Sequence, residues 1–171
     1  MKKIISLILA LIVILCLILL PSCSSNPTNS TNSNSNTNED NTKKEGLFYN
    51  KVLASQLLLD IVADDIYPYW YDCIYRNTYS GDIDVAILLA QSNNMENINL
   101  IKTTTDEIKE LYKEIKNNKL GSEAKAVMQA YNEYYDLVIN VSGSFTSYSA
   151  NKETLKRNLN SALDNFLLEI S

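Results

Sequence analysis

The pattern of hydrophobic and polar positions divides the chain into three stretches. Residues 4–20 carry no charge and are almost all aliphatic, whereas residues 24–45 contain no aliphatic or aromatic side chain. From Gly46 onward, apolar residues recur at intervals of three and four positions. Such intervals place apolar side chains along one face of an α-helix. The pattern therefore predicts a hydrophobic N-terminal segment, a polar linker and one helical domain over residues 46–171.

Four amphipathic helices account for this domain. The predicted helices begin near Leu47, at Asp82 or Asp84, after Gly121-Ser122, and at Ser149 or Asn151. Aspartate and serine are favoured N-cap residues, and Glu123 stands in the first turn of the third helix, where its charge suits the helix dipole. Pro68 is the one proline of the domain, and we expect it to kink or interrupt the first helix.

The apolar positions of these helices form regular lines. The most regular line, in the third helix, consists of Val127, Tyr131, Tyr134, Val138, Val141, Phe145 and Tyr148, at spacings that alternate between four and three. We therefore expect the third helix to continue through Tyr148. Four helices joined by short loops indicate an all-α fold, an antiparallel up-down four-helix bundle.

The N-terminal segment has the features of a bacterial secretion signal. Two lysines precede the uncharged stretch, and a small residue stands directly before Cys23. The sequence Leu20-Pro21-Ser22-Cys23 resembles the lipobox of bacterial lipoproteins, in which the cysteine thiol takes a diacylglycerol and becomes the first residue of the mature protein. The resemblance implies a signal peptide over residues 1–22, lipidation at Cys23 and attachment to the extracytoplasmic face of the cell membrane.

A retained transmembrane anchor is the alternative for the same segment. The seventeen residues 4–20 would form a helix of about 26 Å, just short of the ~30 Å hydrocarbon core of a bilayer. Pro21 ends a helix at the point where a peptidase needs an extended chain, which favours cleavage and lipidation. Both interpretations place the two lysines in the cytoplasm and the rest of the chain outside it.

The composition of the segment after the lipobox predicts a tether. Residues 23–45 comprise the lipidated cysteine and a stretch rich in Ser, Asn and Thr, which cannot bury enough apolar surface to offset its ordering entropy, so we expect it to be disordered. Without the signal peptide, 13 basic residues remain against 20 acidic ones, a net charge of −7. This acidic balance argues against nucleic-acid binding.

The composition also argues against catalysis and metal binding. The chain contains no histidine, which removes the usual general base, the Ser/His and Cys/His pairs and the commonest metal ligand. Asp64-Asp65 and Asp82-x-Asp84 are the nearest carboxylate clusters, and we interpret them as helix caps or solvent-facing groups. Cys73 follows Trp70 on the apolar face, so we expect a buried structural thiol. The sequence predicts no enzyme, no metal and no cofactor.

One aromatic cluster is the candidate binding surface. Tyr69, Trp70, Tyr71 and Tyr75 lie around Pro68, near the end of the first predicted helix. Because consecutive helical residues are rotated by about 100°, these rings cannot all face the core. Exposed tyrosines are typical of protein interfaces, but the same rings could equally pack across neighbouring helices, which is the commoner arrangement in bundles.

The mature chain resembles the small, uncharacterised helical lipoproteins of low-GC Gram-positive bacteria. The resemblance rests on the lipobox, the polar tether, the Ile74-Tyr75 step and the stretch Gly143-Ser144-Phe145-Thr146-Ser147-Tyr148-Ser149. It implies the membrane address and the helical fold and adds no activity. Two functions stay open: an interaction module that engages another envelope or membrane protein, and a small-ligand or sensor domain with a pocket between helices.

The lipobox generates the first prediction, which concerns the anchor. Replacing Cys23 with alanine removes the thiol that takes the lipid, so the variant should leave the detergent phase in a partitioning assay and lose its acyl label. A variant of Cys16, within the signal segment, is the matched control and should partition like the parent. A full-length, membrane-bound Cys23→Ala protein would instead indicate a spanning anchor.

Overall fold

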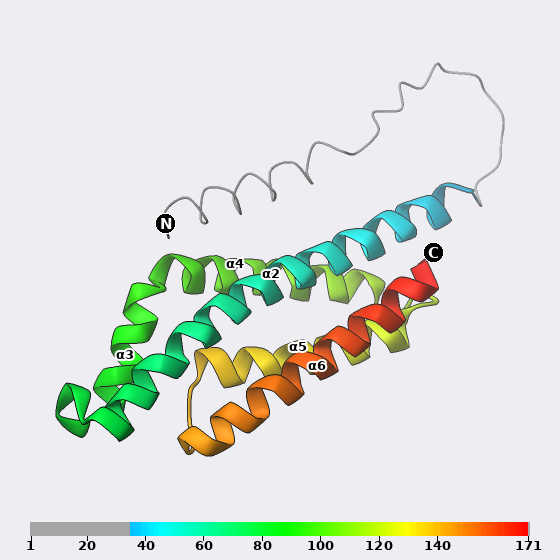
Figure 1. The fold of residues 1–171 in the computed structure, drawn as a ribbon. Coiled ribbons are helices and arrows are strands. Elements are labelled where there is room, and N and C mark those ends of the chain that lie inside the picture. Colours follow the sequence, from blue (N-terminus) through cyan, green and yellow to red (C-terminus); the bar gives the residue numbers. More distant parts are fainter. Residues whose placement is uncertain (1–34, 171) are drawn as a thin grey trace. The chain divides into compact units, whose positions relative to one another are not determined.

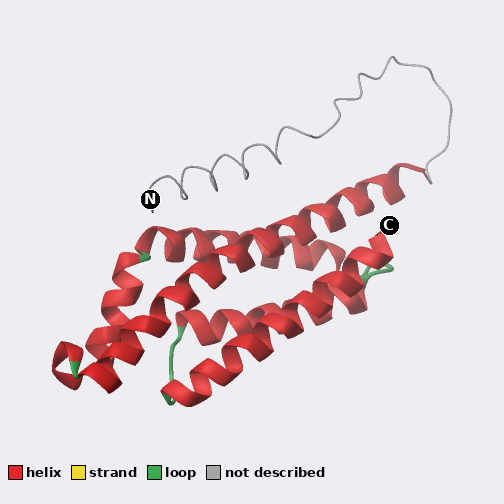
Figure 2. Cartoon of the chain, in the orientation of Figure 1, coloured by secondary structure: helices red, strands yellow, loops and turns green. Residues whose placement is uncertain are grey.

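The first helix begins earlier than the apolar pattern predicts. The computed structural model describes residues 35–170, and its first helix, α2, spans Ser35–Arg76, 42 residues (Figures 1 and 2). The prediction of a disordered tether is therefore wrong for residues 35–45, where Lys44 forms ion pairs with Asp40 at 2.8 Å and with Glu114 of the distant helix α4 at 3.2 Å. The signal segment, Cys23 and the rest of the tether lie outside the described residues.

Pro68 does not interrupt α2. The helix runs continuously through it, so the expected interruption is wrong. A proline removes one backbone hydrogen bond, here the bond to the carbonyl of Asp64. Both Asp64 and Pro68 are exposed, so water can reach that carbonyl, and the cost of the missing bond stays small.

A left-handed turn ends α2 and leads into the next helix. Asn77, Tyr79 and Ser80 have positive φ angles of 52°, 59° and 56°, and the turn contains the short 3-10 helix η1, Thr78–Gly81. Asp82 then caps helix α3, Ile83–Asn93, by accepting a hydrogen bond from the backbone N–H of Val85 at 3.1 Å. This confirms Asp82 as the predicted cap.

The second predicted helix is divided in two. Helix α3 ends at Asn93 and helix α4 spans Met95–Ile115, so the expectation of one continuous helix is wrong. The break is at Asn94, whose buried side chain donates to the carbonyl of Ala90 at 3.0 Å and to Asp65 of α2 at 2.9 Å. Asparagine side chains compete in this way with the backbone bonds of a helix.

The third and fourth helices meet earlier than expected. Helix α5 spans Gly121–Ile139 and helix α6 spans Phe145–Ile170, so the prediction that the third helix continues through Tyr148, and the predicted starts at Ser149 or Asn151, are wrong. Gly143 has a φ of 88°, which other residues rarely adopt, and Ser144 and Ser147 cap α6 through reciprocal backbone-to-hydroxyl bonds of 3.0 and 3.1 Å.

The described part of the chain is all-helical. It contains five α-helices and no strand, which confirms the all-α fold class, and residues 36–170 belong to one compact unit. Helices α5 and α6 lie side by side, and α4 contacts both α3 and α5 (Figure 1). Side chains of α2 bond to α5, as between Ser55 and Tyr131. The largest fully buried side chains are Trp70, Tyr131, Tyr134, Tyr148, Phe48 and Phe166. Over residues 35–170, no helix combines the length and apolar character that crossing a bilayer requires.

Two glycines provide a stability test of the fold. A Cβ atom added at Gly121 would lie 2.1 Å from the backbone oxygen of Lys116, whereas one added at Gly46 would have no neighbour within 4 Å. We expect Gly121→Ala to lower the free energy of unfolding by about 1–3 kcal/mol. The control, Gly46→Ala inside α2, should raise it by about 0.5–1 kcal/mol. Urea unfolding followed by circular dichroism measures both, and equal stabilities would contradict the close backbone approach at Gly121.

Candidate functional site

Three tyrosines of α2 form a partly exposed row, which we call the tyrosine ridge: Tyr67, Tyr71 and Tyr75. Residues four apart lie on the same face of a helix. Adjacent ring centroids are 6.3 Å apart for Tyr67 and Tyr71, and 4.7 Å apart for Tyr71 and Tyr75. The side chains are 40%, 37% and 62% exposed. The ridge is therefore a continuous aromatic surface that water still reaches.

Phe145, the first residue of α6, supports the tyrosine ridge. Its ring centroid lies 5.0 Å from that of Tyr67 and 6.1 Å from those of Tyr71 and Tyr75. Edge-on and tilted contacts at these distances are favourable between aromatic rings. The start of α6 at Phe145, rather than later, thus places a fourth ring against the row.

The predicted surface residues separate into three environments. Tyr71 and Tyr75 lie together on the ridge. Trp70 is only 2% exposed and packs against Phe145 at 6.0 Å and Tyr148 at 5.4 Å, so it belongs to the core. Sequence reasoning missed Tyr67, although its spacing of four from Tyr71 was visible. It also missed Phe145, which only tertiary packing brings to the ridge.

Tyr69 faces a different side of α2. Its ring stacks on Tyr79 with centroids 5.9 Å apart, and its hydroxyl accepts a hydrogen bond from the amide of Asn93, the last residue of α3. Partial desolvation raises the pKa of Tyr79 above its ordinary value, and the neighbouring Tyr69 adds to the effect. Tyr69 thus holds the turn η1 and the end of α3 against α2, so we assign it a structural position apart from the ridge.

Three of the four carboxylates named from the sequence make local or interhelical contacts, and the fourth, Asp84, is exposed in the first turn of α3. Asp64 accepts from Lys152 of α6 at 2.6 Å, Asp65 accepts from Asn94, and Asp82 caps α3. Among residues 35–170, no group of three or more histidine, cysteine, aspartate or glutamate side chains is arranged to hold a metal ion. Cys73 is buried, as predicted.

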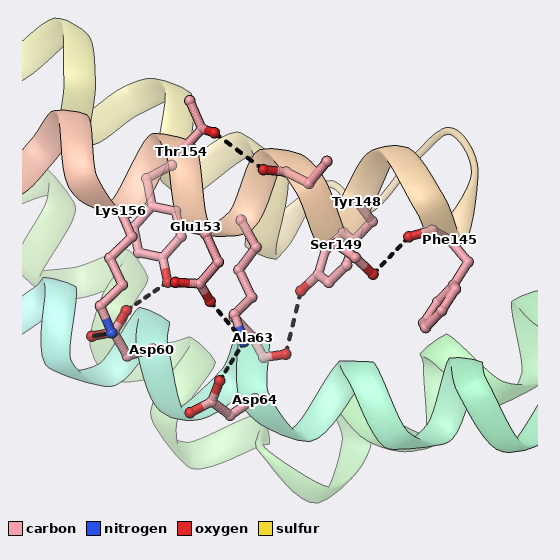
Figure 3. A network of polar contacts seen from close by, with 12 residues as sticks. Asp60, Ala63, Asp64, Phe145, Tyr148, Ser149, Glu153, Thr154 and Lys156 are labelled. Carbon is pink, nitrogen blue, oxygen red and sulfur yellow. Dashed lines mark hydrogen bonds and ion pairs between the residues drawn. The ribbon is translucent and has the colours of Figure 1, made fainter.

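A row of polar contacts joins α2 to α6 and α5 (Figure 3). Asp60 accepts from the hydroxyl of Tyr134 at 2.6 Å and pairs with Lys156 at 2.9 Å. The hydroxyl of Tyr148 points to the carbonyl of Ala63 at 3.5 Å. Asp60, Tyr134 and Tyr148 therefore each meet a polar partner from another helix.

Tyr131 makes a second interhelical junction. Its hydroxyl hydrogen bonds to Ser55 of α2 at 2.7 Å and to Thr105 of α4 at 2.6 Å. Burial raises the pKa of Tyr131, Tyr134 and Tyr148, and the carboxylates of Asp60 and Asp64 raise the last two further. These three hydroxyls are proton donors and structural groups at neutral pH, and none is prepared to act as a base.

A shallow hollow lies on the opposite part of the domain, between α5 and α6. Its volume is about 380 Å³, and it is lined by Ser122, Glu123, Ala126, Ala162, Asn165, Leu168 and Glu169. A hydrogen bond from Ser122 and the backbone N–H of Glu123 lower the pKa of the Glu123 carboxyl. Because these residues come from the start of α5 and the end of α6, the hollow is separate from Trp70 and the ridge.

Comparison with protein-family models, curated proteins and solved structures finds no match to this chain.

The buried tyrosines predict a loss of stability at high pH. Their pKa values are raised in the folded state, while those in the unfolded chain stay near 10, so the neutral hydroxyls stabilise the fold below about pH 10. As pH rises above that value, the unfolded state loses protons that the folded state keeps. Three such groups give a slope of up to about 4 kcal/mol per pH unit in the free energy of unfolding.

The measurement is urea unfolding between pH 8 and 12, with tyrosinate absorbance recorded in parallel. Tyr148→Phe removes one buried hydroxyl whose only contact is long, so it should reduce the alkaline slope by about a third. Tyr75→Phe, on the exposed ridge, is the matched control and should leave the slope unchanged. Identical slopes for the two variants would show that burial does not hold the proton on Tyr148.

Proposed function

We propose that this protein is an extracytoplasmic lipoprotein, attached to the cell membrane through acyl chains on Cys23, whose helical domain is a non-catalytic interaction module. The expected partner is another protein of the envelope or membrane. The tyrosine ridge is the proposed contact surface, and its half-exposed rings are the observation that carries the proposal.

The anchor in this proposal rests on the lipobox sequence. The helical start of α2 at Ser35 leaves eleven residues, 24–34, between the lipidated cysteine and the domain. Eleven residues reach at most about 40 Å when fully extended. Such a linker keeps the domain within one protein diameter of the bilayer, where other envelope proteins stand.

We further propose that the domain is an up-down four-helix bundle in which α3 and α4 together form one leg, bent at Asn94. Residues 116–120 join α4 to α5, and residues 140–144 join α5 to α6. Connections of five residues favour antiparallel neighbours. In this arrangement the ridge and Phe145 lie at one end of the bundle, and the start of α2 lies at the other.

The chemistry of the ridge suits a protein partner. Tyrosine supplies a large, rigid contact area at low cost in conformational entropy, and tyrosine and arginine are enriched among residues that dominate binding energy. The guanidinium of Arg76 lies 6.0 Å from the ring centre of Tyr71 and pairs with Asp72 at 3.1 Å. Aromatic rings beside a held guanidinium offer both apolar area and a hydrogen-bond donor to a partner.

A small-ligand or sensor function is less well supported by the geometry. The space beside Trp70 is occupied by the rings of Phe145 and Tyr148. The hollow between α5 and α6 is open, and its lining mixes the apolar Ala126, Ala162 and Leu168 with four polar or charged side chains. Ligand pockets are usually deeper and more apolar.

Photocrosslinking in intact cells tests the interaction module. A photoreactive residue at position 75 should give a discrete adduct with one envelope protein, because Tyr75 is the most exposed ring of the ridge. The same residue at position 49, also on α2 and partly buried, is the matched control and should not give that adduct.

Loss of the adduct on changing the rest of the ridge completes the test. Tyr67→Ser with Tyr71→Ser should abolish the adduct, with the fold checked by circular dichroism. Tyr75→Ser alone should lower the free energy of unfolding by less than about 0.5 kcal/mol, whereas Trp70→Ala should lower it by about 3–5 kcal/mol. An adduct that survives the double change, or equal adducts from positions 49 and 75, would contradict the ridge as the contact surface.

A further inference from the structure

Helix α3 turns its large aliphatic side chains outward. Its buried residues are Ala86 and Ala90, while Leu88 is 65% exposed and the neighbouring Val85 and Leu89 are about 40% exposed. The two alanines let α3 lie close to the rest of the domain, and the side-chain amide of Gln91 donates to the carbonyl of Ile139 at the end of α5, at 3.1 Å. The helix is thus held by two small buried alanines and a polar contact, and its large aliphatic side chains remain exposed.

The outward face has the spacing of a helix-pairing surface. Val85, Leu88, Leu89 and Ser92 follow one another at intervals of three, one and three, which places them along one stripe. We call these four residues the α3 face. None of them is charged, and the charged groups of this region, Asp82 and Asp84, stand at the N-terminal end of the helix. The face is therefore an uncharged apolar stripe with acidic groups at one end only.

This charge pattern discriminates between occupants of the α3 face. Helices that lie on membranes usually carry lysine or arginine on their polar side, whereas α3 carries only acidic groups, which anionic headgroups repel. A second copy of the chain fits better when the two α3 helices run antiparallel. Parallel pairing would place Asp84 against Asp84 of the other copy, while antiparallel pairing puts the two Asp84 carboxylates at opposite ends of the contact.

The same antiparallel register matches the side chains of the face. A two-fold axis that passes between Leu88 and Leu89 places Leu88 of one copy opposite Leu89 of the other copy. It also places Val85 of one copy opposite the small Ser92 of the other. The surface is then self-complementary, as a two-fold interface requires. We propose that two copies of this protein pair through antiparallel contact of their α3 faces.

The size of the face indicates how strong the pairing is. A helix of eleven residues is about 16 Å long, and one face of it cannot supply the ~1,000 Å² that a stable interface buries. The pair should therefore be weak in dilute solution. Attachment of both copies to one membrane raises their effective concentration, and this step rests on the lipid anchor of the proposed function.

Cysteine crosslinking of the full chain in its own membranes tests the pairing. Leu88→Cys and Leu89→Cys should each form a disulfide-linked dimer of twice the monomer mass under mild oxidation, because both positions lie beside the proposed two-fold axis. Asp84→Cys should not link to itself, because antiparallel pairing separates the two copies of this position. Val85→Cys and Ser92→Cys should link to each other when co-expressed. Lys125→Cys, exposed on α5, is the matched control for random collisions.

The outcomes separate the pairing from the anchor. The pairing would be overturned if Leu88→Cys gives no more dimer than Lys125→Cys, both in membranes and with concentrated full-length protein in detergent. Crosslinking in concentrated detergent solution but not in membranes would support the pairing. It would contradict the proposal that attachment to one membrane raises the effective concentration of the two copies. Crosslinking of Asp84→Cys to itself would overturn the antiparallel register. Adding Leu89→Asp to Leu88→Cys should abolish the dimer, because it places a charge within the apolar stripe.

Discussion

The hydrogen bonds of buried tyrosine hydroxyls determine how the helices are set against one another. Tyr131 of α5 bonds both to Ser55 of α2 and to Thr105 of α4, so a single hydroxyl joins three helices. One helical turn further along α2, Asp60 accepts from Tyr134 and pairs with Lys156 of α6. A buried polar group left without its partner costs about 1–3 kcal/mol, so sliding α2 by one turn would break both junctions. Apolar packing alone would tolerate more than one alignment.

The alignment of α2 decides where the tyrosine ridge lies. With Asp60 held by α5 and α6, the last turns of α2 pass beside the beginning of α6, and Phe145 meets the rings of Tyr67 and Tyr71. Trp70, one position from Tyr71, is rotated into the core against Tyr148. The same helix therefore supplies a core ring and a surface ridge, because neighbouring positions point in different directions.

The ion pairs add less to the fold than the buried junctions do. Lys51 with Glu107 and Lys113 with Glu110 lie at the surface, where water and salt weaken them to about 0–1 kcal/mol. The pair of Lys44 with Glu114 is exposed to a similar degree and falls in the same range, although it joins the early turns of α2 to the end of α4.

The sequence by itself determined the features that depend on local chemistry. Spacings of three and four predicted an all-α domain, Asp82 was one of two predicted caps, and the position of Cys73 on the apolar face predicted its burial. These features follow from side-chain direction and from hydrogen bonds within a few residues, which the order of the residues specifies.

Only the tertiary structure decided where the helices begin and end and which rings meet. The break at Asn94 involves Asp65 of another helix, and the early part of α2 meets Glu114 of α4. The apolar line from Val127 to Tyr148 appeared continuous in sequence because the two helices it spans, α5 and α6, bury their faces in the same core. Phe145 reaches the ridge only because α6 packs against α2. Such contacts join residues far apart in the chain, so periodicity along the sequence does not specify them.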